Sequence, residues 1–153
     1  MVRHARIADV PIIHQLLMVY AREGQLLGRS LADIYAVVRD FYVYEEDGNI
    51  LGVGALSVFW KDLAEVRSLA VASGQQGKGI GRQIVEECLK EAREMGLERV
   101  FCLTYKPDFF RALGFTEIEK SELPQKIWRD CINCVQFPDC DETALAINLL
   151  SQP

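Results

Sequence analysis

Long hydrophobic runs and an excess of positive charge are both missing from this sequence. No apolar stretch approaches the roughly 20 residues that a membrane-spanning helix requires. The first residues, "MVRHARIADV", contain no hydrophobic core of a secretory signal, so we expect a cytoplasmic protein without a membrane partner. A net charge of −5 also disfavours nucleic acid as the main partner, because a polyanion attracts basic surfaces.

The sequence has few histidines and an odd number of cysteines, and both facts limit which metal, catalytic or disulfide sites it can form. The 2 histidines, His4 and His14, lie near the N-terminus, and we assign neither a role in a site. The 5 cysteines, without an export signal, favour free thiols or metal ligands over disulfides. No internal repeat or low-complexity tract interrupts the 153 residues, so we expect one domain over residues 1–153 with a Cys-containing insert at 121–141.

The insert carries the spacing C-x₂-C-x₅-C through Cys131, Cys134 and Cys140. A C-x₂-C pair is typical of a zinc site, and Asp141 or the distant Cys102 would be candidates for the fourth ligand. The signature is incomplete, because a second C-x₂-C pair and a local histidine are missing. Reduced thiols that pack a loop are the alternative, so a structural zinc stays a hypothesis.

Hydrophobic periodicity predicts the elements and their order. Asp9 is a candidate N-cap of the first helix, and "SLAD" resembles a capping box with Ser30 as N-cap and Asp33 three residues later. Helices are expected at 9–24, 30–38, 79–95 and 107–114, and strands at 41–46, 50–60, 63–71, 97–105, 116–120 and 143–150. With an initial strand, the order β-α-α-β-β-β-α-β-α-β-β predicts an α/β (α+β) domain. Its mixed sheet would join an antiparallel N-terminal meander to a central parallel βαβ pair.

The stretch "VASGQQGKGIGRQIVEECLKEAR" joins a loop of small residues to a helix. Unpaired N–H groups at a helix N-terminus attract anions, and Gly77, Gly79 and Gly81 would let a phosphate approach without a Cβ in the way. Lys78 and Arg82 add positive charge nearby. A dinucleotide-binding reading fails because the loop follows an antiparallel meander, and a P-loop reading fails because Gly-Lys-Ser/Thr is missing. A pyrophosphate is therefore the expected ligand, with a merely flexible loop as the alternative.

Several motifs resemble those of the GCN5-related N-acetyltransferases. "QQGKGIG" is similar to the family's acyl-CoA-binding signature, Gln/Arg-x-x-Gly-x-Gly/Ala, through Gln76, Gly79 and Gly81, and "FFRALGF" resembles its "FYxxxGF" segment. "RSLADIY", "DLAEVRSLAV", "VFCLTYKPDFFRALGF" and "LPQKIW" further resemble the short, stand-alone N-acetylglutamate synthases. The resemblance implies acetyl transfer from acetyl-CoA to the α-amino group of L-glutamate, the first step of arginine biosynthesis. Because family members are often dimers, a homodimer is also expected.

The resemblance also implies where the cosubstrate binds. In this family the strand before the loop carries a bulge and splays from its parallel neighbour, and pantetheine occupies the gap. The residues implied for acetyl-CoA are Leu69, Ala70, Val71, Gln76, Gly77, Lys78, Gly79, Ile80, Gly81, Arg82, Phe109 and Phe110. A main-chain N–H at the strand end would face the thioester oxygen and stabilise the tetrahedral oxyanion.

Catalytic side chains are expected on both central strands. Glu65 lies upstream of the thioester position and is the candidate general base, acting through water. The family often uses a tyrosine in the "FYxxxGF" segment as the acid, but this chain has Phe110 there. Tyr105 and Thr104, at the end of the parallel strand, are the substitutes. Surface or packing roles are the alternatives for each.

An anionic acceptor needs cations, and three are candidates. Arg67 lies two residues after Glu65 and so on the same strand face, where a guanidinium suits a carboxylate. Arg29 opens the second helix, and Lys126 lies in the insert. Another amine (glutamine, another amino acid, a protein N-terminus or a polyamine) is the alternative acceptor. A non-catalytic acyl-CoA-binding module is the alternative class.

Overall fold

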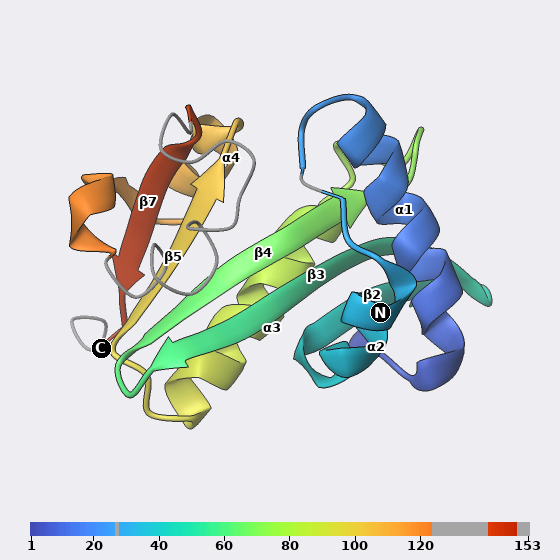
Figure 1. Ribbon diagram of the computed structural model, residues 1–153, viewed down its shortest axis with the longest axis horizontal. Coiled ribbons are helices and arrows are strands. Elements are labelled where there is room, and N and C mark those ends of the chain that lie inside the picture. Colours follow the sequence, from blue (N-terminus) through green and yellow to red (C-terminus); the bar gives the residue numbers. More distant parts are fainter. Residues whose placement is uncertain (27, 124–140, 150–153) are drawn as a thin grey trace.

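The computed structural model describes residues 1–26, 28–123 and 141–149, and one sheet runs through them (Figure 1). The strand order is β1-β2-β3-β4-β5-β7-β6. The strands are β1 (Val2–His4), β2 (Phe41–Glu46), β3 (Asn49–Trp60), β4 (Leu63–Val71), β5 (Arg99–Thr104), β6 (Thr116–Glu117) and β7 (Thr143–Asn148). The α-helices are α1 (Val10–Arg22), α2 (Leu31–Ala36), α3 (Ile80–Glu94) and α4 (Pro107–Arg111). The predicted order of elements is confirmed.

The sheet is antiparallel except at its centre. β1 to β4 form a meander in which every neighbour is antiparallel, and a tight turn at Asp47 and Gly48, both with positive φ, joins β2 to β3. Such a turn matches the twist of a hairpin and favours Asp-Gly. β4 and β5 form the parallel pair, with α3 as the crossover. The mixed α+β sheet expected from the sequence is therefore present.

Helices cover both faces of the sheet (Figure 1). Ile13 and Leu17 of α1 and Ile34 of α2 pack against Phe41 of β2 and its neighbours on one face. On the other face, the apolar stripe of α3 packs against alternate residues of β3 and β4. Two cores on opposite faces explain why β3 is almost continuously buried rather than alternating.

A bulge in β4 and an early end to its pairing shape the centre of the sheet. Ala55 pairs with Arg67, and the next pair is Val53 with Ala70, so Gly54 alone faces two β4 residues, one of them Ser68. Ser68 has φ +55°, a left-handed conformation that is uncommon for a residue with a side chain. The pairing of β4 with β5 ends at the third pair, Glu65 with Phe101. Beyond it the two strands separate, as the resemblance implies.

Some local expectations need correction. Asp9 stands before α1, but its carboxylate accepts the Arg6 N–H at 2.7 Å and pairs with Arg3 at 2.8 Å, so it closes a preceding turn and does not cap α1. Ser30 does cap α2, since its Oγ accepts the Asp33 N–H at 3.1 Å. The second helix and the strand from residue 116 are both shorter than expected.

No helix in the described ranges combines the length and the apolar character that a membrane span requires.

Candidate active site

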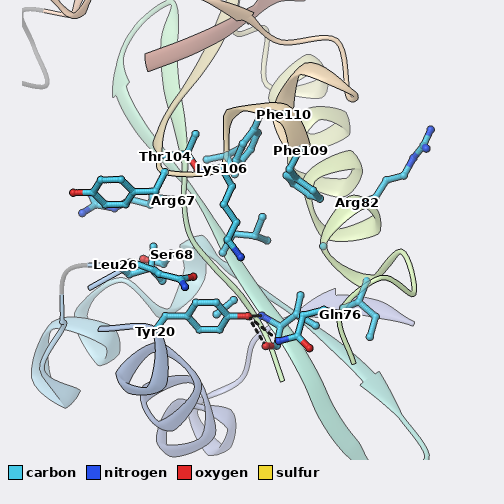
Figure 2. Close-up of a pocket in the computed structure, with 18 of the residues that line it drawn as sticks. Tyr20, Leu26, Arg67, Ser68, Gln76, Arg82, Thr104, Lys106, Phe109 and Phe110 are labelled. Atoms are coloured by element: carbon cyan, nitrogen blue, oxygen red, sulfur yellow. Dashed lines mark hydrogen bonds between the residues drawn. The ribbon is translucent and has the colours of Figure 1, made fainter. Parts of the chain in front are cut away.

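A pocket of about 320 Å³ lies where β4 and β5 separate. Its walls come from four segments: the end of α1 with the loop after it, β4 beyond Glu65, the loop that leads into α3, and the chain from β5 into α4. Figure 2 shows Gln76 at one end of this pocket and Arg67 with Thr104 toward the other. The pocket therefore connects the glycine-rich loop to the cationic part of β4.

The glycines of the loop have two separate functions in the structure. Gly77 and Gly79 have φ +79° and +82°, and a Cβ at either would meet nothing within 4 Å, so backbone conformation rather than space requires glycine there. Gly81 is different, because a Cβ there would lie 3.3 Å from Cζ of Phe109. Gly81 thus lets α4 approach the first turn of α3. The N-terminus of α3, which begins at Ile80, is open to the pocket as an anion site needs.

The two basic residues of the loop lie differently from each other. Arg82 lines the pocket and also pairs with Glu86 at 2.8 Å on the exposed side of α3. The Lys78 ammonium donates to Gln75 Oε1 at 3.1 Å, and Lys78 is not among the lining residues. Main-chain N–H groups are therefore the main donors that this end of the pocket offers to an anion.

The predicted base and the predicted substrate cation form a pair. Glu65 is 3% exposed, and its Oε1 lies 3.7 Å from Nη1 of Arg67. Arg67 lines the pocket, whereas Glu65 lies behind it and does not. A carboxylate in this place favours the charged guanidinium and helps to orient it.

Arg29 reaches the bulge of β4 from the loop before α2. Its Nη1 donates to Ser68 Oγ at 3.4 Å, and its guanidinium lies 5.8 Å from the ring centre of Phe41. Ser68 lines the pocket, but Arg29 does not. Arg29 therefore contacts the bulge from outside the pocket wall.

The two candidate acids end β5. Thr104 lines the pocket, and its Oγ1 accepts the Lys106 N–H at 2.9 Å. The Tyr105 hydroxyl donates to Asp141 Oδ1 at 2.6 Å, which already engages its proton. Phe110 is buried and packs edge-on against Phe109 and Phe115, and the ring that replaces the family's tyrosine also lines the pocket.

Eight lining residues were not predicted from the sequence: Tyr20, Gln25, Leu26, Val66, Ser68, Gln75, Leu103 and Lys106. Tyr20 reads as a core residue of α1, because it continues the helical spacing of Ile13 and Leu17. Lys106 follows β5 as an ordinary loop lysine, yet its side chain extends into the pocket (Figure 2). No sequence pattern marks Ser68 as the bulged residue.

Lys126 and the three cysteines of the insert lie outside the described residues, so the predicted substrate contact and the zinc hypothesis stay predictions. Within residues 1–26, 28–123 and 141–149, no group of three His, Cys, Asp or Glu is placed to hold a metal. Cys102, the distant candidate ligand, is 1% exposed, and burial raises the pKa of its thiol.

Known proteins share this sequence and fold. The sequence profile of the acetyltransferase (GNAT) family matches residues 12–117. An uncharacterized N-acetyltransferase of Chlorobaculum tepidum is 44% identical over 148 residues, which cover 97% of this chain and 96% of the relative. The amino-acid acetyltransferase of Mycobacterium tuberculosis is 43% identical over 130 residues, which cover 83% of this chain and 74% of that protein.

A solved structure extends the likeness to three dimensions. It is N-acetylglutamate synthase from Neisseria gonorrhoeae, complexed with coenzyme A and N-acetyl-glutamate, and it matches with a TM-score of 0.87 at 28% identity. The match covers 97% of this chain and 35% of that chain, so it concerns about a third of the longer enzyme. Profile, relatives and fold agree, and the chain belongs to the acetyltransferase (GNAT) family of enzymes.

Proposed function

We propose that this enzyme transfers the acetyl group of acetyl-CoA to the α-amino group of L-glutamate, as the first step of arginine biosynthesis, and that residues 1–153 form one catalytic domain. The observation that carries the proposal is one pocket with the N-terminus of α3 at one end and Arg67 at the other. That arrangement suits a diphosphate-bearing donor and a carboxylate-bearing acceptor. The Mycobacterium and Neisseria relatives, by their names, act on amino acids and on glutamate respectively.

Acetyl-CoA is assigned to the loop and the splayed edge of β4. The main-chain N–H groups around Gly77, Gly79 and the start of α3 would hold the pyrophosphate, with Arg82 beside it. The pantetheine arm would then follow β4 past Val71 toward the bulge, where main-chain groups have no β5 partner. Phe109 closes the opposite wall.

The acceptor is assigned to the end that holds Arg67. A guanidinium binds a carboxylate with two parallel hydrogen bonds, and Glu65 keeps this one oriented. Arg29 and the insert's Lys126 are the further proposed contacts to the acceptor. A polyamine is disfavoured here, because a cationic substrate would face Arg67 and Lys106 across the pocket.

The chemistry needs one proton removed and one thiol released. The neutral amine attacks the thioester carbonyl, and a main-chain N–H at the bulge would stabilise the oxyanion. The C–S bond then breaks, the nitrogen loses its proton, and the thiolate takes one up. Glu65 is proposed to receive the amine proton through water, since it does not line the pocket. Thr104 is the better placed donor of the two predicted acids, because the Tyr105 hydroxyl is engaged by Asp141.

A steady-state assay of free CoA release tests the proposal. Acetyl-CoA would be offered with glutamate, glutamine, other amino acids, an N-terminal peptide and spermidine. Glutamate-dependent release supports the proposal, whereas release with another amine keeps the family and rejects glutamate. Arg67→Lys should raise the KM for glutamate far more than the KM for acetyl-CoA, because lysine keeps the charge but loses the paired hydrogen bonds.

The role of Glu65 is tested separately. Glu65→Gln should lower kcat by orders of magnitude and leave CoA binding intact if Glu65 accepts the proton. A raised glutamate KM with unchanged kcat would instead assign Glu65 to the orientation of Arg67. The homodimer is a further prediction, to be checked by the mass of the protein in solution.

A further inference from the structure

Where β4 separates from β5, one side chain makes the main-chain hydrogen bonds that a neighbouring strand would otherwise make. Ala72 donates its N–H to Leu51 O at 2.8 Å, and Val71 lies opposite Gly52 on β3. Because main-chain groups alternate in direction along a strand, the N–H and C=O of Val71 point away from β3 and into the gap. Buried or half-buried main-chain groups need partners, and here the partner comes from α1.

That partner is the hydroxyl of Tyr20. It donates to Val71 O at 2.8 Å and accepts the Val71 N–H at 3.3 Å. Gln76 Nε2 also donates to it, at 3.4 Å (Figure 2). A phenol has one donor and two acceptor positions, and all three are used. Gln76 is held in turn, because its Oε1 accepts the Gly74 N–H at 3.0 Å.

The same residue also fixes the segment after α1. The Gln25 N–H donates to Tyr20 O at 3.0 Å, and both Gln25 and Leu26 line the pocket. Side chain and main chain of Tyr20 thus connect three parts of the wall: α1 with its following loop, the edge of β4, and the glycine-rich loop. Sequence separation is large, since the two hydrogen-bonded positions are 51 residues apart.

We propose that Tyr20 is a positioning residue for acetyl-CoA, an inference that rests on the proposed function. Its hydroxyl sets the distance between the β4 edge and the glycine-rich loop before the cosubstrate arrives. The pocket is open with these hydrogen bonds in place, so the hydroxyl need not leave for a ligand to enter. A wall that is already ordered saves the entropy that binding would otherwise cost.

Tyr20→Phe tests this, because it removes only the hydroxyl and keeps the ring packed. Tyr35→Phe is the matched control, since Tyr35 is 42% exposed on α2 and does not line the pocket. The Kd of CoA, measured by calorimetry, and the KM for acetyl-CoA should rise about 3- to 10-fold in Tyr20→Phe, the range expected for a lost hydrogen bond. The kcat and the acceptor KM should stay close to those of the wild type, as should every constant of Tyr35→Phe.

A second variant and a second readout separate positioning from stability. Gln76→Ala should weaken CoA binding in the same direction, and its effect should not add fully to that of Tyr20→Phe, because both break one network. Hydrogen exchange without ligand should speed up at the Val71 amide in Tyr20→Phe while α1 stays protected.

The possible failures can be told apart. A lower Tm with an unchanged Kd for CoA, or a lower kcat alone, would overturn the positioning role of Tyr20. If the wild type itself does not bind CoA, the proposed function fails, and the inference fails with it. Normal CoA binding by both wild type and Tyr20→Phe would overturn the inference and leave the proposed function standing.

Discussion

Gly54→Ala should lower the stability of the folded protein, because it overpacks the contact between β3 and α3. A Cβ at Gly54 would lie 2.6 Å from Cγ2 of Ile84, about 0.8 Å short of an ordinary contact of about 3.4 Å. The position of Cγ2 is set by χ1, for which a helical isoleucine has one strongly preferred rotamer, so α3 itself must move. Overpacking of this kind costs about 1–3 kcal/mol. Removing a glycine from a strand returns about 0.5–1 kcal/mol, which leaves a net loss of up to about 2.5 kcal/mol.

The assay is thermal unfolding, with Gly28→Ala as the matched substitution. A loss of that size lowers Tm by about 2–4 °C per kcal/mol for a chain of this length. At Gly28 the new Cβ would meet its nearest neighbour at 3.8 Å, an ordinary contact, so alanine there should leave the Tm unchanged or raise it. Because α3 begins at the glycine-rich loop, Gly54→Ala should also raise the KM for acetyl-CoA.

A double mutant decides whether the steric reasoning is right. Ile84→Ala removes Cγ2, so adding Gly54→Ala in that background should cost little or nothing. The reasoning is refuted if Gly54→Ala is as stable as the wild type, or if its cost is the same with and without Ile84.

Three further predictions concern charge and thiol chemistry. Lys106→Met should lower kcat/KM for acetyl-CoA by roughly 10-fold or more, the size expected for a lost charged hydrogen bond. Lys106→Arg should keep most of the wild-type kcat/KM. Initial rates at limiting acetyl-CoA measure both. The Arg3 guanidinium holds the pKa of the Asp9 carboxyl below its ordinary value, so this pair stabilises the fold above about pH 4 and the stabilisation is lost as pH falls through the lowered pKa. The Tm difference between wild type and Asp9→Asn should therefore shrink from pH 7 to pH 3, and a constant difference would contradict this. Burial raises the thiol pKa values of Cys88 and Cys102, so mass spectrometry after alkylation at pH 8 should find both unmodified in the folded protein and modified in denaturant.

The sequence was sufficient to predict the order of elements, because each element has its own period. The helical stripe of α3 and the Asp-Gly turn between β2 and β3 are local signals, and both lie where they were expected. The glycine-rich loop was also found from local residues. Its glycines proved to differ in purpose, since Gly79 needs a positive φ and Gly81 makes room for Phe109.

What the sequence did not reveal depends on contacts between distant segments. Tyr20 has the spacing of a core residue, and only the position of Val71 turns its hydroxyl toward the pocket. The bulge at Ser68 lies within an apolar stretch that reads as an ordinary strand, so it was expected only from the family resemblance. Asp9 was wrongly predicted to cap α1. The sequence pattern of a carboxylate before a helix is the same whether that carboxylate binds the helix or an arginine such as Arg3.

The bulge at Ser68 lets β4 contribute both to the hydrophobic core and to the pocket. Before it, alternate residues such as Val66 face α3, and Arg67 faces the other side. Strict alternation would then turn Ala70 toward α3, but the extra residue shifts the period, and Ala70 joins the core under α1 instead. A left-handed Ser68 costs about 1–2 kcal/mol, and both cores together with the hydrogen bond from Arg29 keep it in place. The strain is therefore located where main-chain groups must be turned away from the sheet to face a ligand.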